Sequence, residues 1–127
     1  MELSQASFLP DPDATVHGSV MFEQGATLVM RIGIAPTPTA TWIFGRDDAA
    51  PDYHVLYADD RGVSRVYRMT FNDGTWRMWR DTPEFSQRFD ADVTPGQAEI
   101  KGRWQKSVDG GTTWEHHFTV RYSREPT

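Results

Sequence analysis

A predicted β-hairpin near the middle of the chain contains the side chains best suited to chemistry. Two arginines, Arg65 and Arg80, and one tyrosine, Tyr67, alternate there with apolar residues. Asp73-Gly74 predicts a two-residue turn, because both residue types tolerate positive φ. Successive strand side chains point to opposite faces, so this turn places Tyr67 opposite Arg80 and puts Arg65 on the same face. Guanidinium groups among apolar side chains could hold a carboxylate or another anion.

A second interpretation of Arg65 and Arg80 is structural. Each could pair with an acid inside the protein, or reach water at the rim of a barrel. An unpaired buried guanidinium would cost several kcal/mol, so we expect a partner of one kind or the other. The sequence leaves both interpretations open.

The same register predicts the facing of the whole hairpin. We expect Arg68, Arg77 and Trp79 to point outward, and the inward face to hold Phe71, Trp76, Met69, Met78, Tyr67 and Arg80. An outward Trp79 would be a large exposed apolar group. It therefore predicts a covering loop or an oligomer contact, for example in a homodimer.

Alternation in two later segments adds further polar residues to the predicted interior. In Phe85-Ser86-Gln87-Arg88-Phe89, the glutamine shares a face with the two phenylalanines. In the last strand, His116 and Tyr122 fall on the inward face and His117 on the solvent face. The predicted ligand-binding residues are Arg80, Tyr67, Arg65, His116, Gln87 and Tyr122. No catalytic residue or metal ligand is predicted, because the histidines are scattered and no metal-ligand spacing occurs. The sequence does not identify a cofactor.

The elements that would position these residues are short strands. Alternating segments separated by turn residues are expected near 2–9, 14–24, 27–35, 39–46, 52–58, 62–72, 75–81, 85–92, 97–107 and 113–124. Such spacing is typical of an all-β sandwich or barrel. Sequentially connected strands favour an antiparallel up-and-down barrel, because closure removes the sheet edges. We expect nine or ten strands and a single domain over residues 1–127.

Composition excludes several classes of protein. A net charge of −5 argues against nucleic-acid binding, and no apolar run is long enough to span a bilayer. The absence of cysteine excludes disulfides and thiolate chemistry. The start of the chain has no basic and apolar signal pattern, so a cytoplasmic location is expected. Eleven arginines against two lysines hint at a GC-rich bacterial genome.

From about residue 57 to 124 the chain resembles an uncharacterised bacterial calycin-like family. The residues concerned are YADDRGVSRVYRM, DGTWRMWRDTPEFSQRF and IKGRWQKSVDGGTTWEHHFTVRYSR. The family consists of small lipocalin-like or fatty-acid-binding-protein-like barrels of unknown function. The resemblance implies a barrel with a central cavity, and it brings no catalytic residue. The N-terminal half lacks the Gly-x-Trp strand usual in such barrels, which leaves full closure open.

Ser107 to Trp114 also matches the S-x-D-x-G-x-T-W pattern of the Asp-box in sialidase propellers. The pattern occurs once, so a propeller is excluded. We expect an ordinary hairpin turn in which Ser107 and Asp109 accept hydrogen bonds from backbone amides.

Three functions follow from this interior. The first is binding of a small, largely apolar molecule with a polar or acidic head inside the barrel. The second is a small cyclase-like or isomerase-like enzyme that encloses its substrate, with Tyr67, His116 and Arg80 as acid, base and anion stabiliser. The third is a barrel filled by its own side chains, which acts through its surface. A large empty cavity would favour the first two.

Overall fold

The computed structural model describes residues 1–4, 6, 15–24, 28–33, 39–46, 48–49, 51–94 and 96–123, with the backbone alone for 21–24. Within these residues the chain is all-β and contains no helix that could cross a membrane. Some positions of the strands predicted at 2–9, 14–24, 27–35 and 113–124 lie outside them. The strands are β1 (Glu2–Ser4), β2 (Val16–His17), β3 (Ser19–Gln24), β4 (Leu28–Gly33), β5 (Ala40–Arg46), β6 (Tyr53–Asp59), β7 (Ser64–Asn72), β8 (Thr75–Arg80), β9 (Ser86–Asp92), β10 (Glu99–Ser107) and β11 (Glu115–Ser123).

All eleven strands belong to one antiparallel sheet with the order β2-β1-β11-β10-β9-β8-β7-β6-β5-β4-β3. The two outermost strands, β2 and β3, follow one another in the chain and are separated only by Gly18. Gly18 exchanges two backbone hydrogen bonds with Met1, at 3.0 and 3.2 Å, which extend the pairing of β1 with β2. The chain therefore passes from one edge of the sheet to the other at Gly18. The result is the nearly closed up-and-down barrel that the turn spacing predicts.

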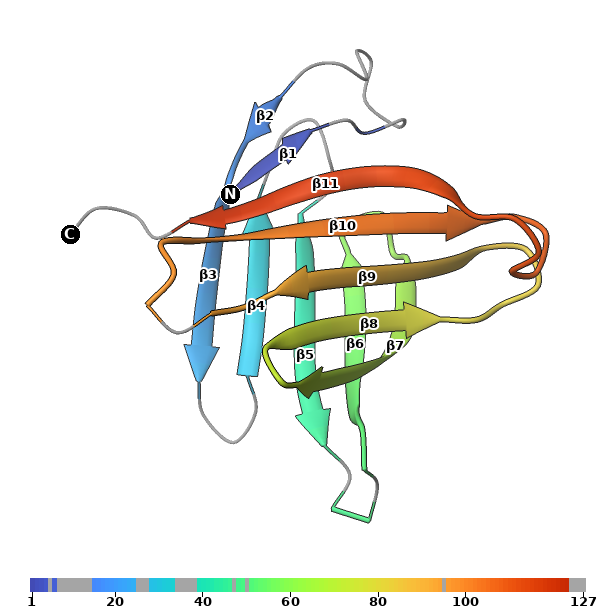
Figure 1. The fold of residues 1–127 in the computed structure, drawn as a ribbon, viewed down its shortest axis with the longest axis horizontal. Coiled ribbons are helices and arrows are strands. Elements are labelled where there is room, and N and C mark those ends of the chain that lie inside the picture. Colours follow the sequence, from blue (N-terminus) through green and yellow to red (C-terminus); the bar gives the residue numbers. More distant parts are fainter. Residues whose placement is uncertain are drawn as a thin grey trace.

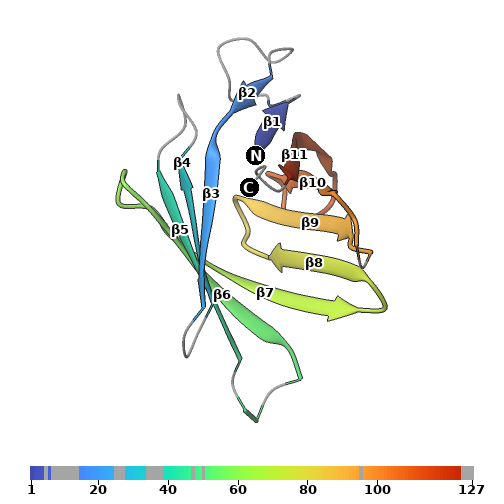
Figure 2. The same ribbon diagram turned by 90° about the vertical axis from the view of Figure 1, so that its left-hand side faces the viewer.

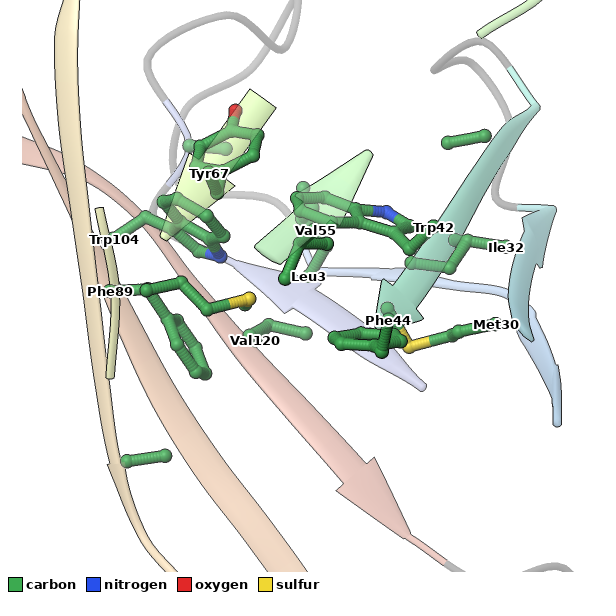
Figure 3. Close-up of a cluster of buried hydrophobic side chains, with 14 residues drawn as sticks. Leu3, Met30, Ile32, Trp42, Phe44, Val55, Tyr67, Phe89, Trp104 and Val120 are labelled. Carbon is green, nitrogen blue, oxygen red and sulfur yellow. The ribbon is translucent and has the colours of Figure 1, made fainter. Parts of the chain in front are cut away.

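The barrel is flattened into two layers that cross. Strands β3 to β6 run roughly perpendicular to β8 to β11, and β7 passes between the two groups (Figures 1 and 2). Side chains from both layers point toward one another in the interior, as Figure 3 shows for Trp42 of β5 and Trp104 of β10. The buried core contains Leu3, Ala6, Met30, Ile32, Ala40, Trp42, Phe44, Val55, Tyr67, Met78, Phe89, Ala91, Trp104 and Val120.

The register predicted for the β7–β8 hairpin is confirmed. Asp73 and Gly74 have φ angles of 53° and 78°, as a tight turn of this kind requires. Phe71 pairs with Trp76, and Met69 pairs with Met78. Phe71 itself differs from the prediction. It is 48% exposed rather than inside, because it lies at the tip of the hairpin, where the core ends.

The outward face of this hairpin explains how Trp79 is accommodated. Trp79 is half-buried, and the Arg68 guanidinium lies 5.5 Å from the centroid of its ring. On the other side, Trp79 pairs with Arg88 of β9. Arg68 thus covers part of the indole within a single chain. The homodimer stays a prediction.

A β-bulge in β11 reverses the predicted facing of the two adjacent histidines. Trp104 of β10 pairs with Phe118, but the next residue, Gln105, pairs with His116, so His117 is the extra residue of the bulge. His116 is consequently exposed and His117 half-buried. The prediction that His116 points inward and His117 outward is therefore wrong, because strict alternation does not survive the inserted residue.

Candidate functional site

One row of polar side chains crosses the inner face of the barrel near one end. Arg80 of β8 pairs directly with Gln87 of β9, and Gln87 pairs with Lys106 of β10. Residues in direct cross-strand pairs have Cβ atoms about 5 Å apart on the same face of the sheet. Arg80 and Lys106 therefore flank Gln87 on the interior side. The sequence predicted the inward positions of Arg80 and Gln87.

Tyr67 and Gln87 form a buried hydrogen bond within this row. The Tyr67 hydroxyl donates to Gln87 Oε1 at 2.5 Å, and the two residues are only 1% and 4% exposed. Burial raises the pKa of Tyr67, although the nearby charges of Arg65 and Arg80 act in the opposite direction. Both guanidinium groups thus lie close to the phenol. Tyr67 and Gln87 form the floor of the site, beneath the two arginines.

Arg65 lies between two aromatic rings. Its guanidinium carbon is 5.1 Å from the ring centroid of Phe85 and 5.8 Å from that of Tyr57, its cross-strand neighbour. Cation–π contacts of this kind hold the side chain in place without using its hydrogen-bond donors. The edge of the Arg65 guanidinium lies near the Tyr67 hydroxyl, which Arg80 also approaches.

No carboxylate among the described residues lies within ion-pair distance of Arg65 or Arg80. Arg80 Nε is buried and donates no hydrogen bond within that part of the chain. The internal acid required by the first structural interpretation is thus not seen there, whereas both arginines are half-buried at the end of the barrel, as the alternative of a rim position requires. A buried donor without an acceptor costs free energy, which a bound anion would recover.

Asp59, an acid on β6 near this end, is fully engaged elsewhere. Its carboxylate accepts hydrogen bonds from the Tyr57 hydroxyl at 2.6 Å, from Arg61 Nη2 at 2.6 Å and from the backbone amides of Arg61 and Val63. These hydrogen bonds lower the pKa of Asp59 well below its usual range, and the bond from the Arg61 side chain has the largest effect. Asp59 therefore ties together the β6–β7 turn.

Two residues that the sequence reasoning missed complete the cluster. The Lys106 side chain is 24% exposed, and its ammonium lies 3.9 Å from Glu115 Oε1. Burial, and then the charges of Lys106 and Arg65, lower the pKa of His117 to about 4, so its imidazole is neutral at pH 7. We call Arg65, Arg80, Lys106 and His117 the cationic end of the barrel. Extending the alternation of Ile100, Gly102 and Trp104 by one step would have identified Lys106.

The remaining predicted residues do not join the cationic end. Tyr122 pairs with Ile100, and its ring centroid is 6.1 Å from that of Trp76, toward the opposite end of the barrel. His116 faces outward, where it lines a surface hollow of about 430 Å³ together with Asp90, Ala91, Asp92, Lys101, Gly102, Arg103 and Thr119. Four of the six predicted residues, Arg65, Tyr67, Arg80 and Gln87, are thus brought together.

Aromatic packing fills the barrel below the site. The rings of Trp42, Tyr67 and Trp104 have centroids 5.2 to 5.9 Å apart, and Phe89 lies 5.1 Å from Trp104. All four side chains are buried. Side chains with so little accessible surface line no space large enough for a long ligand. Among the described residues, these four side chains therefore leave the end of the barrel, rather than the space between their rings, as the position for a ligand.

The described residues contain no group of three histidine or acidic side chains that could hold a metal ion. Comparison with family models, curated proteins and solved structures finds no match to this chain. The resemblance to calycin-like barrels remains a prediction, and the site has to be interpreted from its own geometry.

Proposed function

We propose that this protein binds a small, largely apolar molecule through an acidic head group held by Arg65 and Arg80 at the cationic end. The observation behind the proposal is that two guanidinium groups face the interior with no described carboxylate to pair them, and that Arg80 Nε is buried without an acceptor among the described residues. Phe85 and Tyr57 supply apolar surface beside Arg65. A few directed polar groups on an apolar wall are usual in ligand sites.

The packed interior restricts the ligand. Tyr67, Trp42 and Trp104 close the barrel beneath the arginines, so a long acyl chain has no room along the axis in this conformation. A compact molecule, for example one with a single aromatic ring, fits the proposal better. The enzyme alternative loses its suggested base, because His116 lies on the outer face.

A barrel that acts through its surface is the second candidate, and one observation favours it. Ile43 pairs with Leu56, and Leu56 pairs with Val66, so these three form an apolar row across the outer face of β5, β6 and β7. All three are exposed. Exposed apolar rows of this kind occur at protein interfaces.

The test is a fluorescence titration with 8-anilinonaphthalene-1-sulfonate, an aromatic monoanion. Arg80→Ala should weaken binding at least about tenfold, equivalent to about 1.4 kcal/mol. Arg80→Lys should weaken it less, because the charge is kept and the bidentate fork is lost. Arg77→Ala, on the outward face of the same strand, is the matched control and should bind as the wild type does.

Thermal melts of the same variants separate binding from structure. Arg80→Ala should melt at or above the wild-type temperature, because it removes a guanidinium that has no described acid partner. Equal binding by all four proteins would refute the proposal. A large loss of stability in Arg80→Ala would return the residue to a structural role.

A further inference from the structure

We infer that the acidic group bound at the cationic end is a dianion of the phosphate-monoester type, and that Lys106 provides the contact that distinguishes it from a monoanion. The inference rests on the proposed function. It adds the charge state of the ligand and a residue that selects it.

The position of Lys106 follows from the strand register. Arg80, Gln87 and Lys106 occupy directly paired positions on β8, β9 and β10, so the two cationic residues are separated by two strand spacings, roughly 10 Å. Both have long side chains and start from the same inner face. They can converge above Gln87 on one ligand, with Arg65 reaching in from β7.

The charges at this end favour two negative charges on the ligand. Arg65, Arg80 and Lys106 are cations, and the ion pair that the structure shows between them and a described acid joins Lys106 to the largely exposed Glu115, at 3.9 Å. Together these three cations and Glu115 carry a net charge of about +2. A carboxylate would leave one cation uncompensated, whereas a phosphate monoester above its second pKa would compensate both.

The donors at this end also outnumber what one carboxylate accepts. Each guanidinium presents a planar fork of N–H groups, and the ammonium adds up to three donors. A phosphate monoester offers three strongly accepting oxygens arranged tetrahedrally, so it can meet donors arriving from β7, β8 and β10. A planar carboxylate can face only part of this set.

Competition against the bound fluorescent sulfonate tests the inference at pH 7.5. Phenyl phosphate and benzenesulfonate present the same ring with two charges and one charge, respectively. Wild-type protein should bind phenyl phosphate about tenfold more tightly. Inorganic phosphate, which lacks the ring, should compete more weakly than phenyl phosphate if the head group belongs to an organic ester, and equally well if free phosphate is the ligand.

The chain offers a matched pair of lysine variants, because Lys101 and Lys106 lie on the same strand and face opposite sides. Lys106→Met should remove most of the preference for phenyl phosphate and leave benzenesulfonate binding within about twofold. Lys101→Met should change neither. Thermal melts of both variants confirm folding before the comparison is made.

The outcomes separate this inference from the proposed function. Equal affinity for the two competitors, with binding still dependent on Arg80, overturns the dianion inference and keeps the anion site. Equal effects of Lys101→Met and Lys106→Met also overturn it. Binding that is independent of both Arg80 and Lys106 removes the site altogether.

Discussion

Replacement of Gly102 by alanine tests how tightly the barrel is packed beneath the cationic end. A Cβ atom at this position would lie 2.2 Å from Cε2 and 2.5 Å from Cζ of Phe89, and 3.3 Å from Cγ1 of Val120. Optimal carbon–carbon contacts are about 3.5–4.0 Å, so the phenyl ring has to move by more than about 1 Å. The Phe89 ring lies 4.7 Å from Trp76 and 5.1 Å from Trp104, which leaves it little space.

We expect Gly102→Ala to cost about 2–3 kcal/mol, the upper part of the range for overpacked cores. At about 2.1 cal/mol/K of unfolding entropy per residue, this lowers the melting temperature by roughly 7–11 °C. Thermal unfolding followed by circular dichroism measures the change. Gly45→Ala is the control, because no described atom beyond its two chain neighbours lies within 4 Å of its added methyl group. It should leave the melting temperature nearly unchanged.

The double variant Gly102→Ala/Phe89→Leu locates the origin of the cost. Leucine makes room for the methyl group, so the double variant should lose less stability than the sum of the two single variants. A Gly102→Ala protein as stable as Gly45→Ala would refute the packing argument. Such a result would mean that Phe89 can move aside, and it would reopen the barrel interior to a longer ligand.

Two further predictions concern residues of the site. His117 has a pKa of about 4 in the fold, below its ordinary value of 6.5, so the unfolded chain takes up a proton that the folded chain does not. The free energy of unfolding should therefore reach its full value above about pH 6.5 and fall by roughly 2–3 kcal/mol as the pH drops toward 4. Urea titrations at several pH values should show a smaller dependence of this free energy on pH for His117→Asn. The same pH dependence in both proteins would contradict the assignment. Tyr67→Phe removes the buried donor to Gln87 and should cost about 1–3 kcal/mol of stability. Adding Gln87→Leu to this variant should recover part of the loss. If thermal melts show that the effects of the two substitutions simply add, the hydrogen bond is unimportant.

Local chemistry determined the fold class and much of the site. Asp73-Gly74 specifies a tight turn because both residues adopt positive φ, and that turn fixes the register of β7 against β8. Once the register is fixed, the period of two along each strand places Tyr67 and Arg80 on the inner face. Gln87 joins them because its own strand alternates in the same way. These are short-range rules, so the sequence alone is sufficient to apply them.

Long-range packing decided the features that the sequence could not provide. The bulge at His117 depends on how β11 pairs with β10, and one inserted residue exchanges the facing of His116 and His117. The engagement of Asp59 by Tyr57 and Arg61 depends on the geometry of the folded β6–β7 turn. Whether Arg80 has an acid partner depends on which side chains the closed sheet brings within 4 Å. Alternation determines the face on which a residue lies, and only the closed barrel determines what it meets there.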